Sequence, residues 1–349
     1  MRGAFPIILF LVLTGCTAKS TLPIETILQD AKLTAHLLEP ADVDVPFAQS
    51  ESPVLLVYAN NYIVKIVQSK ASTGNKLLEI YRFGDNCPLY SAIDYGGLEG
   101  QFLSAIPYIQ GDSLILHDII KNLVAFVDLK SALQDSTYQP TVKEMNILTN
   151  FMIPYKNGVL YLSPYWTSDN RVRYNDKGEK FLVSGPDLTP AWEDGKYLTT
   201  NITAGCIVSN KKKDRILFFD AIDDLAEVYD YSLNLLKIIT GPDDIRPEFM
   251  FPNDEHPIAI QVGEHCDTYL FGVCGSDEDV FAAYQGKGSD GDTGTYIFHF
   301  DWDGNLHDTY YVEGMVYGNL SASMDGRILY ASVLDSCGRQ RFCQYSITN

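Results

Sequence analysis

After Ser52 the hydrophobic positions of the chain fall into short apolar runs, most of them ended by Gly, Asp, Asn or Ser. The run at 159–162 is followed by RVRYNDKGEKFLV, in which Val172 and Tyr174 alternate with polar residues ahead of an Asn-Asp-Lys-Gly turn at 175–178. Tyr, Phe, Val and Ile dominate these runs, and residues of this kind favour strands over helices. The pattern therefore predicts β-hairpins.

The same hairpin pattern recurs along the chain. It is clearest in AEVYDYSLNLLKII, where the turn falls at 232–234, and in YIFHFDWDGNLHDTYYV, where WDGN turns at 302–305. Further copies lie at 62–83, 114–129 and 322–334, the last with an Asp-Gly turn. Asp-Gly and related pairs supply the positive φ that tight hairpins need, so each copy is expected to form two adjacent antiparallel strands.

Hairpins repeated about every 40–60 residues predict four-stranded blades around a central channel. The repeating units start near residues 54, 102, 151, 205, 258 and 316. The predicted fold is an all-β propeller with six blades of four-stranded antiparallel sheet, and seven blades is the alternative. Two β-sandwiches would use the same hairpins, but no linker rich in Pro, Gly and Ser divides the chain. The segment 274–294 predicts an elongated loop or an added strand pair.

The first residues form a targeting segment. Arg2 precedes an apolar run at 4–13, and Leu-Thr-Gly-Cys follows at 13–16. Ten apolar residues are too few for a helix across a hydrocarbon core of ~30 Å, so the run predicts a signal peptide over 1–15. The cysteine at its end predicts lipidation of Cys16; an ordinary secretory signal with a chance cysteine is the alternative.

The expected organisation has three parts. Residues 1–15 form the lipoprotein signal peptide, residues 16–50 a lipidated tether and lead-in with a short helix or strand before Pro40, and residues 51–349 the propeller. The chain has 45 Asp and Glu against 26 Lys and Arg, a formal net charge of −19. So acidic a surface repels phosphate backbones, which excludes nucleic acid as a partner. The lipid, rather than charge, must provide the membrane contact.

Six cysteines remain once Cys16 is assigned to lipid, and an exported chain can keep disulfides. The expected pairs are Cys266 with Cys274 and Cys337 with Cys343, because each pair lies on a short segment able to form a hairpin. The alternative is that several are buried thiols. Structural zinc is disfavoured, since none of the cysteines has the C-x-x-C spacing.

One family resemblance combines several of these features. The Leu-Thr-Gly-Cys lipobox, the hairpin at 296–312 and the segment GMVYGNLSASMDGRILY at 314–330 resemble the TolB-like six-bladed β-propeller lipoproteins of Bacteroidetes. The likeness spans most of residues 50–349 and implies a propeller on the cell envelope. The family supplies no catalytic motif, so the resemblance assigns no active-site residue.

No catalytic residue is predicted. The chain lacks the G-x-S-x-G nucleophile elbow, and its histidines show no H-E-x-x-H or other paired ligand spacing. They are His36, His117, His256, His265, His299 and His307. A metal site built from His256, His265 and Cys266 is a minor alternative to ordinary hydrogen-bonded loop histidines.

Two further groups of residues are candidates for binding. Asp290 and Asp292 in GSDGDTG place oxygen atoms at alternate positions, as calcium loops do, and Ca²⁺ is the one cofactor considered. The similar spacing at 301–305 is better explained by carboxylates that bond turn N–H groups. Tyr165, Trp166 and Trp192 lie beside turns, where aromatic side chains bind glycans or peptides. The alternative is that tryptophans, Trp302 included, pack between blades.

These observations predict a binding or scaffolding propeller with a protein or glycan partner. The competing interpretation is an enzyme with a lyase- or glycosidase-like site in the central channel, built from dispersed Asp, Glu and His. The sequence Thr-Ala-Lys-Ser at 17–20 lacks the acidic cluster that resembles a surface-export signal of Bacteroidetes. The expected location is therefore the outer membrane, facing the periplasm.

Overall fold

The computed structural model describes most of the chain outside its termini. The residues described in full are 24–45, 53–67, 76–145, 149, 151–156, 158–162, 205–221, 223–245, 268–269, 272–287 and 294–347. Six short strands are described by their backbone alone: β14 (Tyr165–Trp166), β15 (Val172–Asp176), β16 (Glu179–Val183), β17 (Tyr197–Leu198), β22 (Glu248–Met250) and β23 (Ile260–Val262).

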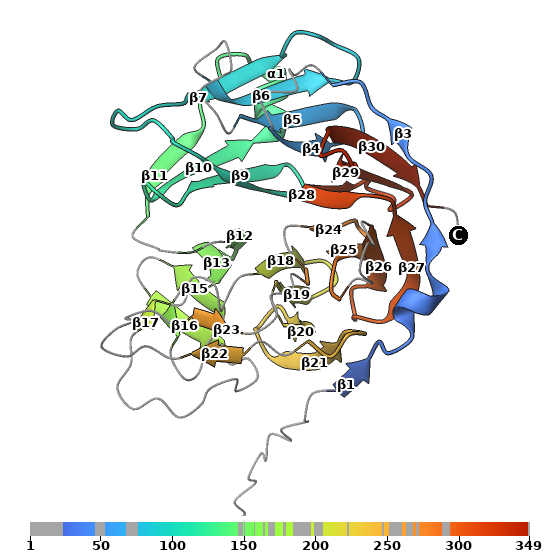
Figure 1. Cartoon of the computed structure of the whole chain (residues 1–349). Coiled ribbons are helices and arrows are strands. Elements are labelled where there is room, and N and C mark those ends of the chain that lie inside the picture. The colour runs from blue at the N-terminus through green and yellow to red at the C-terminus, as the bar shows by residue number, and fades with distance from the viewer. Residues whose placement is uncertain are drawn as a thin grey trace, which may run out of the picture.

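Within these residues the strands form six sheets of four or five strands, arranged around a common centre (Figure 1). The first holds β4 (Val54–Tyr58), β5 (Tyr62–Ile66), β6 (Lys76–Arg82) and β7 (Tyr90–Asp94). The second holds β8 (Ile106–Gln110), β9 (Ser113–Asp118), β10 (Leu123–Asp128) and β11 (Thr141–Glu144), with helix α1 (Leu129–Gln134) between the last two. The third holds β12 (Met152–Tyr155), β13 (Gly158–Leu162), β15 and β16.

The remaining sheets use the second half of the chain and a segment from its beginning. The fourth holds β18 (Gly205–Asn210), β19 (Arg215–Asp220), β20 (Leu225–Asp230) and β21 (Leu235–Thr240). The fifth holds β24 (Val273–Gly275), β25 (Asp279–Tyr284), β26 (Thr295–Asp301) and β27 (Leu306–Val312). The sixth holds β28 (Met315–Ala322), β29 (Ile328–Leu334) and β30 (Gln340–Ser346). The two-stranded sheets β14–β17 and β22–β23 lie outside this series.

The sheets close into a ring because each buries its two apolar faces against its two neighbours. The described residues contain six buried clusters, and each joins two neighbouring sheets. One cluster joins the β18–β21 and β24–β27 sheets through Phe219 and Phe298, and another joins the last sheet to the first through Phe342 and Leu55. The predicted all-β propeller of four-stranded antiparallel sheets is confirmed.

The segment before the propeller belongs to its sheets. β1 (Ile24–Ile27) pairs in parallel with β21, β2 (His36–Leu37) pairs in parallel with β27, and β3 (Ala41–Asp42) supplies the fourth strand of the last sheet. The short 3₁₀ helix η1 (Ala31–Thr34) lies between β1 and β2. Figure 1 shows this blue segment, which we call the strap (residues 24–45), running along the outer edges of three blades. The predicted lead-in is therefore not separate from the fold.

The predicted turns lie where the pattern placed them. Asp301 accepts hydrogen bonds from the backbone N–H of Asn305 (2.8 Å) and from its side-chain amide (2.8 Å), and Gly304 adopts φ +71°. Asp230 and Asn234 make the equivalent bonds at 2.9 and 2.8 Å. The motif 301–305 is therefore hairpin turn chemistry, as predicted.

Two local predictions were wrong. The fifth blade begins at Val273, not near residue 258, because the preceding connection carries β22 and β23 before the blade starts. The segment 274–294 is no added strand pair: it contains the end of β24 and all of β25, two regular strands of that blade.

Trp302 packs between blades, with 4% of its surface exposed. This agrees with the alternative prediction that the tryptophan packs in the core instead of binding a ligand.

Candidate functional site

The direction of the strands divides the connections of the propeller between two faces. Successive strands of a blade are antiparallel. Connections from first to second and from third to fourth strands therefore emerge on one face, which we call the tight-turn face. Connections from second to third strands, and from each blade to the next, emerge on the opposite, long-connection face. The two longest connections, 184–204 and 241–272, both belong to the long-connection face.

The residues predicted for ligand binding all fall in connections that begin and end on this one face. β14, which contains Tyr165 and Trp166, lies between the second and third strands of its blade and pairs with β17 of the following connection. The side chains of β14, and Trp192, Asp290, Asp292 and Cys266, lie outside the described residues. The described strands that flank these connections place the start and end of each on the long-connection face.

Beneath this face, a buried carboxylate ends the second strand of two blades. Asp118 at the end of β9 has no exposed surface. It accepts backbone hydrogen bonds from Leu103 (2.6 Å), Ile120 (2.9 Å) and Lys121 (3.0 Å), and thereby ties the inter-blade connection to its own blade. Asp220 at the end of β19 is equally buried and accepts from the N–H of Asp223 at 2.9 Å.

These two carboxylates were not predicted as functional residues from the sequence. The available signal was a repeated ending, since LILHD closes β9 and ILFFD closes β19. A charged residue directly after an apolar run marks the end of a buried strand, where only a partnered carboxylate is tolerated.

A second buried polar group lies on the same face, between the fourth and fifth blades. Asp224 accepts a 2.7 Å hydrogen bond from the N–H of Asp243, and Asp243 accepts another from the Tyr284 hydroxyl at 2.9 Å. Burial raises the pKa of Asp224, and it also raises that of Tyr269 well above its ordinary value. Asp224 Oδ1 and the Tyr269 hydroxyl have no hydrogen-bond partner among the described residues. Buried polar atoms of this kind can receive a water or a ligand group.

His117 is buried at the same end of the second blade, in β9. It has 2% of its surface exposed, and neither ring nitrogen has a hydrogen-bond partner in the described part of the chain. Burial lowers the pKa of His117 to about 4. The negative charge of the neighbouring Asp118 raises this pKa, but by less than burial lowers it. The imidazole is therefore neutral at physiological pH.

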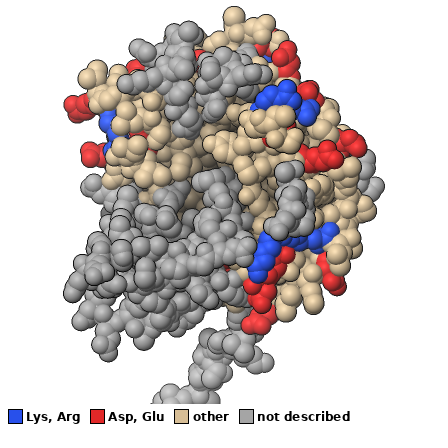
Figure 2. Space-filling view, viewed as in Figure 1, with Lys and Arg blue, Asp and Glu red and all other residues tan. Residues whose placement is uncertain are grey.

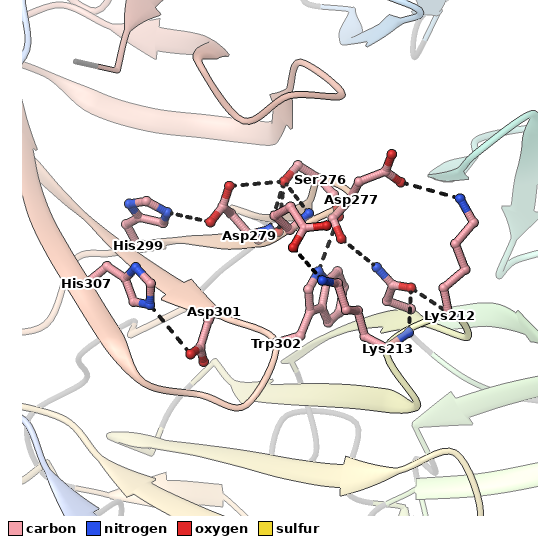
Figure 3. A network of polar contacts seen from close by, with 11 residues as sticks. Lys212, Lys213, Ser276, Asp277, Asp279, His299, Asp301, Trp302 and His307 are labelled. Atoms are coloured by element: carbon pink, nitrogen blue, oxygen red, sulfur yellow. Dashed lines mark hydrogen bonds and ion pairs between the residues drawn. The ribbon is translucent and has the colours of Figure 1, made fainter. Parts of the chain in front are cut away.

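The most extended polar network lies on the tight-turn face (Figure 3). His299 Nε2 is 3.0 Å from Asp279 Oδ1, and the other oxygen of Asp279 lies 3.4 Å from Ser276 Oγ. Ser276 Oγ accepts the backbone N–H of Asp279 at 2.8 Å, which is a turn contact. The Trp302 indole N–H donates to the Ser276 carbonyl at 3.3 Å.

This network does not have the geometry of a hydrolase. A nucleophilic serine needs a base within hydrogen-bond reach, whereas Ser276 contacts the carboxylate and His299 points to the far side of it (Figure 3). His299 is also buried, with its ring stacked on Phe281 at a centroid distance of 4.6 Å. The network holds the hairpin turns of neighbouring blades in place. Lys213 pairs there with Glu278 across the gap between blades.

The predicted disulfide between Cys337 and Cys343 is not formed. Both residues are free thiols, Cys337 exposed in the turn after β29 and Cys343 buried within β30. Cys343 sits opposite Ala331 and Asp42 in the sheet, several residues away from the turn. Strand pairing fixes Cys343 within the sheet, whereas Cys337 lies in the turn, so the two sulfurs stay on separate parts of the hairpin. Cys274 is also a free thiol, half-buried in β24.

The innermost strands surround the central axis of the ring. They are the first strands of the blades, β4, β8, β12, β18, β24 and β28, and neighbours in this series contact one another from β8 through β28 and back to β4. None of their residues is Asp, Glu, His, Lys or Arg. The described residues also contain no group of three or more His, Cys, Asp and Glu able to hold a metal ion. Gln110 of β8 donates to the Ser209 carbonyl of β18 at 2.6 Å, which connects two blades that are not adjacent.

Surface charge is mixed where the structure describes it. On the face seen in Figure 2, Lys and Arg side chains form small groups beside Asp and Glu. Ion pairs of the described residues include Arg215 with Asp303 (2.8 Å) and Arg341 with Asp42 (2.7 Å). None of the helices in the described residues is of a length and hydropathy suited to spanning a bilayer.

Comparison with known proteins identifies the fold. No family model and no curated protein matches the sequence. The structure is similar to that of a Bacteroides fragilis protein whose name calls it exported, with a TM-score of 0.54 and 10% identity over 93% of this chain and 99% of that one. It is also similar to a member of the DUF4221 family from Bacteroides vulgatus, with a TM-score of 0.51 and 9% identity over 90% and 98% of the two chains. At such identities the likeness shows the β-propeller fold alone.

Proposed function

We propose that this chain is an envelope lipoprotein, anchored through Cys16, whose propeller presents its long-connection face to a protein or glycan partner. The observation that carries the proposal is topological. The two longest connections begin and end on that face, and so do the connections whose sequences contain Tyr165, Trp166 and Trp192. Loops that a rigid scaffold holds on one face are the usual place for binding residues.

Two independent observations support export and anchoring. The sequence ends its short apolar segment in Leu-Thr-Gly-Cys, and its hairpins resemble those of the TolB-like propeller lipoproteins. The neighbour from Bacteroides fragilis is called an exported protein. The outer membrane, facing the periplasm, is the proposed location, and protease treatment of intact cells tests it. Digestion without permeabilisation would place the propeller on the cell surface instead.

The enzyme alternative receives less support. A lyase- or glycosidase-like site in the channel needs carboxylates or histidines at its wall, because both chemistries use charged acid–base pairs. The innermost strands carry none. The acid–base side chains of such an enzyme would have to come from the connections between strands, and these are the segments proposed here to bind the partner.

Site-specific photo-crosslinking in cells tests the proposed face directly. A photoreactive phenylalanine analogue replaces Trp166 or Trp192 on the long-connection face, and Asn60 or Lys212 on the tight-turn face provides the matched control. We expect adducts from the first pair and none from the second. Adducts only from the tight-turn positions would overturn the choice of face. A glycan array probed with the purified chain distinguishes a glycan partner from a protein partner.

Incorporation of an alkyne-labelled fatty acid tests the anchor. The wild-type chain should take up the label, and Cys16→Ala should abolish it. Because Cys87 and Cys337 are exposed thiols, Cys87→Ser/Cys337→Ser is the control that must keep the label. Labelling that survives Cys16→Ala would show that another residue is modified.

A further inference from the structure

The strap carries an unusual share of the exposed apolar surface. Among the described residues, eleven large hydrophobic side chains are exposed, and four of them lie between residues 24 and 37. They are Ile24 (67% exposed), Ile27 (70%), Leu33 (82%) and Leu37 (53%). The other seven are spread over several blades. Several exposed apolar side chains close together along one segment point to a contact surface, whereas single ones need no explanation.

The strap is firmly held, so these side chains have a fixed place on the molecule. Leu28, Ala31 and Leu38 are buried against the blades while their neighbours point outward. Backbone bonds of 2.9 Å join Leu28 to Thr240 and Leu38 to Tyr311. The exposed side chains therefore lie along the outer edge of the fourth and fifth blades.

Lys32 fastens the middle of the strap. Its Nζ is 2.9 Å from Asp243 Oδ2 and donates to the Lys287 carbonyl at 2.8 Å. The ammonium also lies over the rings of Tyr284 (5.7 Å) and Tyr296 (5.1 Å). The one cation of the 3₁₀ helix η1 is thus directed into the protein, and Leu33 and Thr34 are its exposed side chains.

The short distance between the strap and the lipidated Cys16 indicates what contacts this surface. Residues 17–23 separate Cys16 from Ile24, and seven residues span at most about 25 Å. An acyl anchor at Cys16 therefore holds Ile24, the first residue of the strap, within about 25 Å of the lipidated cysteine at the bilayer surface. We infer that the outer edge of the strap, through Ile24, Ile27, Leu33 and Leu37, rests in the interface of the membrane that holds the lipid. This inference depends on the anchor proposed above.

The contact would fix the orientation of the propeller. With the edge of the fourth and fifth blades on the bilayer, the channel axis lies closer to the membrane plane than to its normal, because the strap follows the circumference of the ring (Figure 1). Both faces then remain open to the periplasm. Glu25, Asp30 and Glu39 are exposed on the same segment, so the contact should be weaker on anionic than on zwitterionic lipid.

Depth measurements on the lipidated full chain test the inference. Leu33→Cys, in a Cys87→Ser/Cys337→Ser background, is labelled with an environment-sensitive fluorophore and reconstituted into phosphatidylcholine vesicles. Leu98→Cys, 72% exposed and distant from the strap in sequence, is the matched control, and the background without an added cysteine gives the blank. We expect a blue shift and quenching by doxyl-labelled lipid at residue 33 and neither at residue 98. Adding Ile24→Ser, Ile27→Ser and Leu37→Ser should abolish the signal at residue 33.

The outcomes separate this inference from the anchor itself. Fatty-acid labelling of Cys16 is measured on the same preparation. If Cys16 is acylated and the probe at residue 33 stays in water, the strap does not contact the bilayer and the inference is wrong. A blue shift that appears without vesicles and grows with protein concentration would show that a second copy of the chain covers the strap, which would also overturn it. If Cys16 carries no label, the proposed anchor fails and the strap inference fails with it.

Discussion

Aspartates on the two faces of the propeller differ in where their hydrogen bonds come from. On the tight-turn face, Asp301 and Asp230 accept from residues four positions along the chain. On the long-connection face, Asp118 accepts from Leu103, 15 residues distant, as well as from the nearby Ile120 and Lys121. Asp224 accepts from Asp243, 19 residues distant. The first kind of aspartate forms a turn, whereas the second holds a connection onto the ring. Asp301 and Asp230 thus make the local bonds of a turn, whereas Asp118 and Asp224 also connect segments that are distant in sequence.

The comparison predicts that a buried carboxylate of the long-connection face contributes far more to stability than one in a turn. Asp118→Ala removes the acceptor for three partly buried N–H groups at once, those of Leu103, Ile120 and Lys121. A donor left without a partner and shielded from water costs about 1–3 kcal/mol. We expect the free energy of unfolding to fall by about 3 kcal/mol or more, measured by urea denaturation. A loss below about 1 kcal/mol would mean that water replaces the carboxylate there.

His117 extends the comparison to pH. Since its pKa in the folded chain is about 4 and its ordinary value is 6.5, the unfolded chain binds more protons between these values. Stability is therefore fully present above pH 6.5 and is lost as the pH falls toward 4, by about 3 kcal/mol in total. His117→Leu should flatten this part of the stability–pH curve. The exposed His36→Leu is the control, and an equal flattening by both variants would exclude burial as the cause.

The turn aspartates should give a smaller effect. Asp301→Ala removes the bonds to Asn305 but leaves the Gly304 turn and the surrounding strands intact. The expected loss is about 1 kcal/mol, because Asp301 is partly exposed and water can solvate the freed N–H group. Asp230→Ala, at the equivalent turn of the preceding blade, should lose a similar amount. If either variant matched Asp118→Ala, the two faces would not differ in the way described.

What the sequence could predict follows the same division. The turn at 302–305 was predicted correctly because its bonds span only four residues and its geometry is encoded in Asp-Gly chemistry. The strap was not assigned to the propeller, since β1 pairs with β21 more than 200 residues later and in parallel. Its alternating pattern is too short to specify a partner.

The candidate site shows the same limit. The aromatic residues Tyr165 and Trp166 were chosen from local composition, and only the order of strands shows that their connection shares a face with the longest ones. The buried Asp118 was missed, because a carboxylate after an apolar run looks the same in sequence whether its partners are four or fifteen residues away. The pairing of Cys337 with Cys343 was wrong for a related reason: closeness in sequence does not bring two positions together along an extended strand.

Asp224 and Asp325, on opposite faces, should contribute to stability with opposite dependence on pH. Burial raises the pKa of Asp224 on the long-connection face, so its neutral form is favoured in the folded chain. This contribution to stability is fully present below pH 3.8 and is lost as the pH rises through the higher pKa of the folded state. A hydrogen bond from the Ser323 hydroxyl lowers the pKa of Asp325 on the tight-turn face. Its contribution is present above pH 3.8 and is lost as the pH falls through the lower value.

Asp224→Asn and Asp325→Asn should therefore change the slope of stability against pH in opposite directions. Relative to the wild type, Asp224→Asn should gain stability as the pH rises above 3.8, whereas Asp325→Asn should lose less stability on acidification below that value. Urea denaturation at closely spaced pH values measures both slopes in one series. Slopes of the same sign would show that local hydrogen bonds govern both carboxylates, since burial and hydrogen bonding act on an acid in opposite senses.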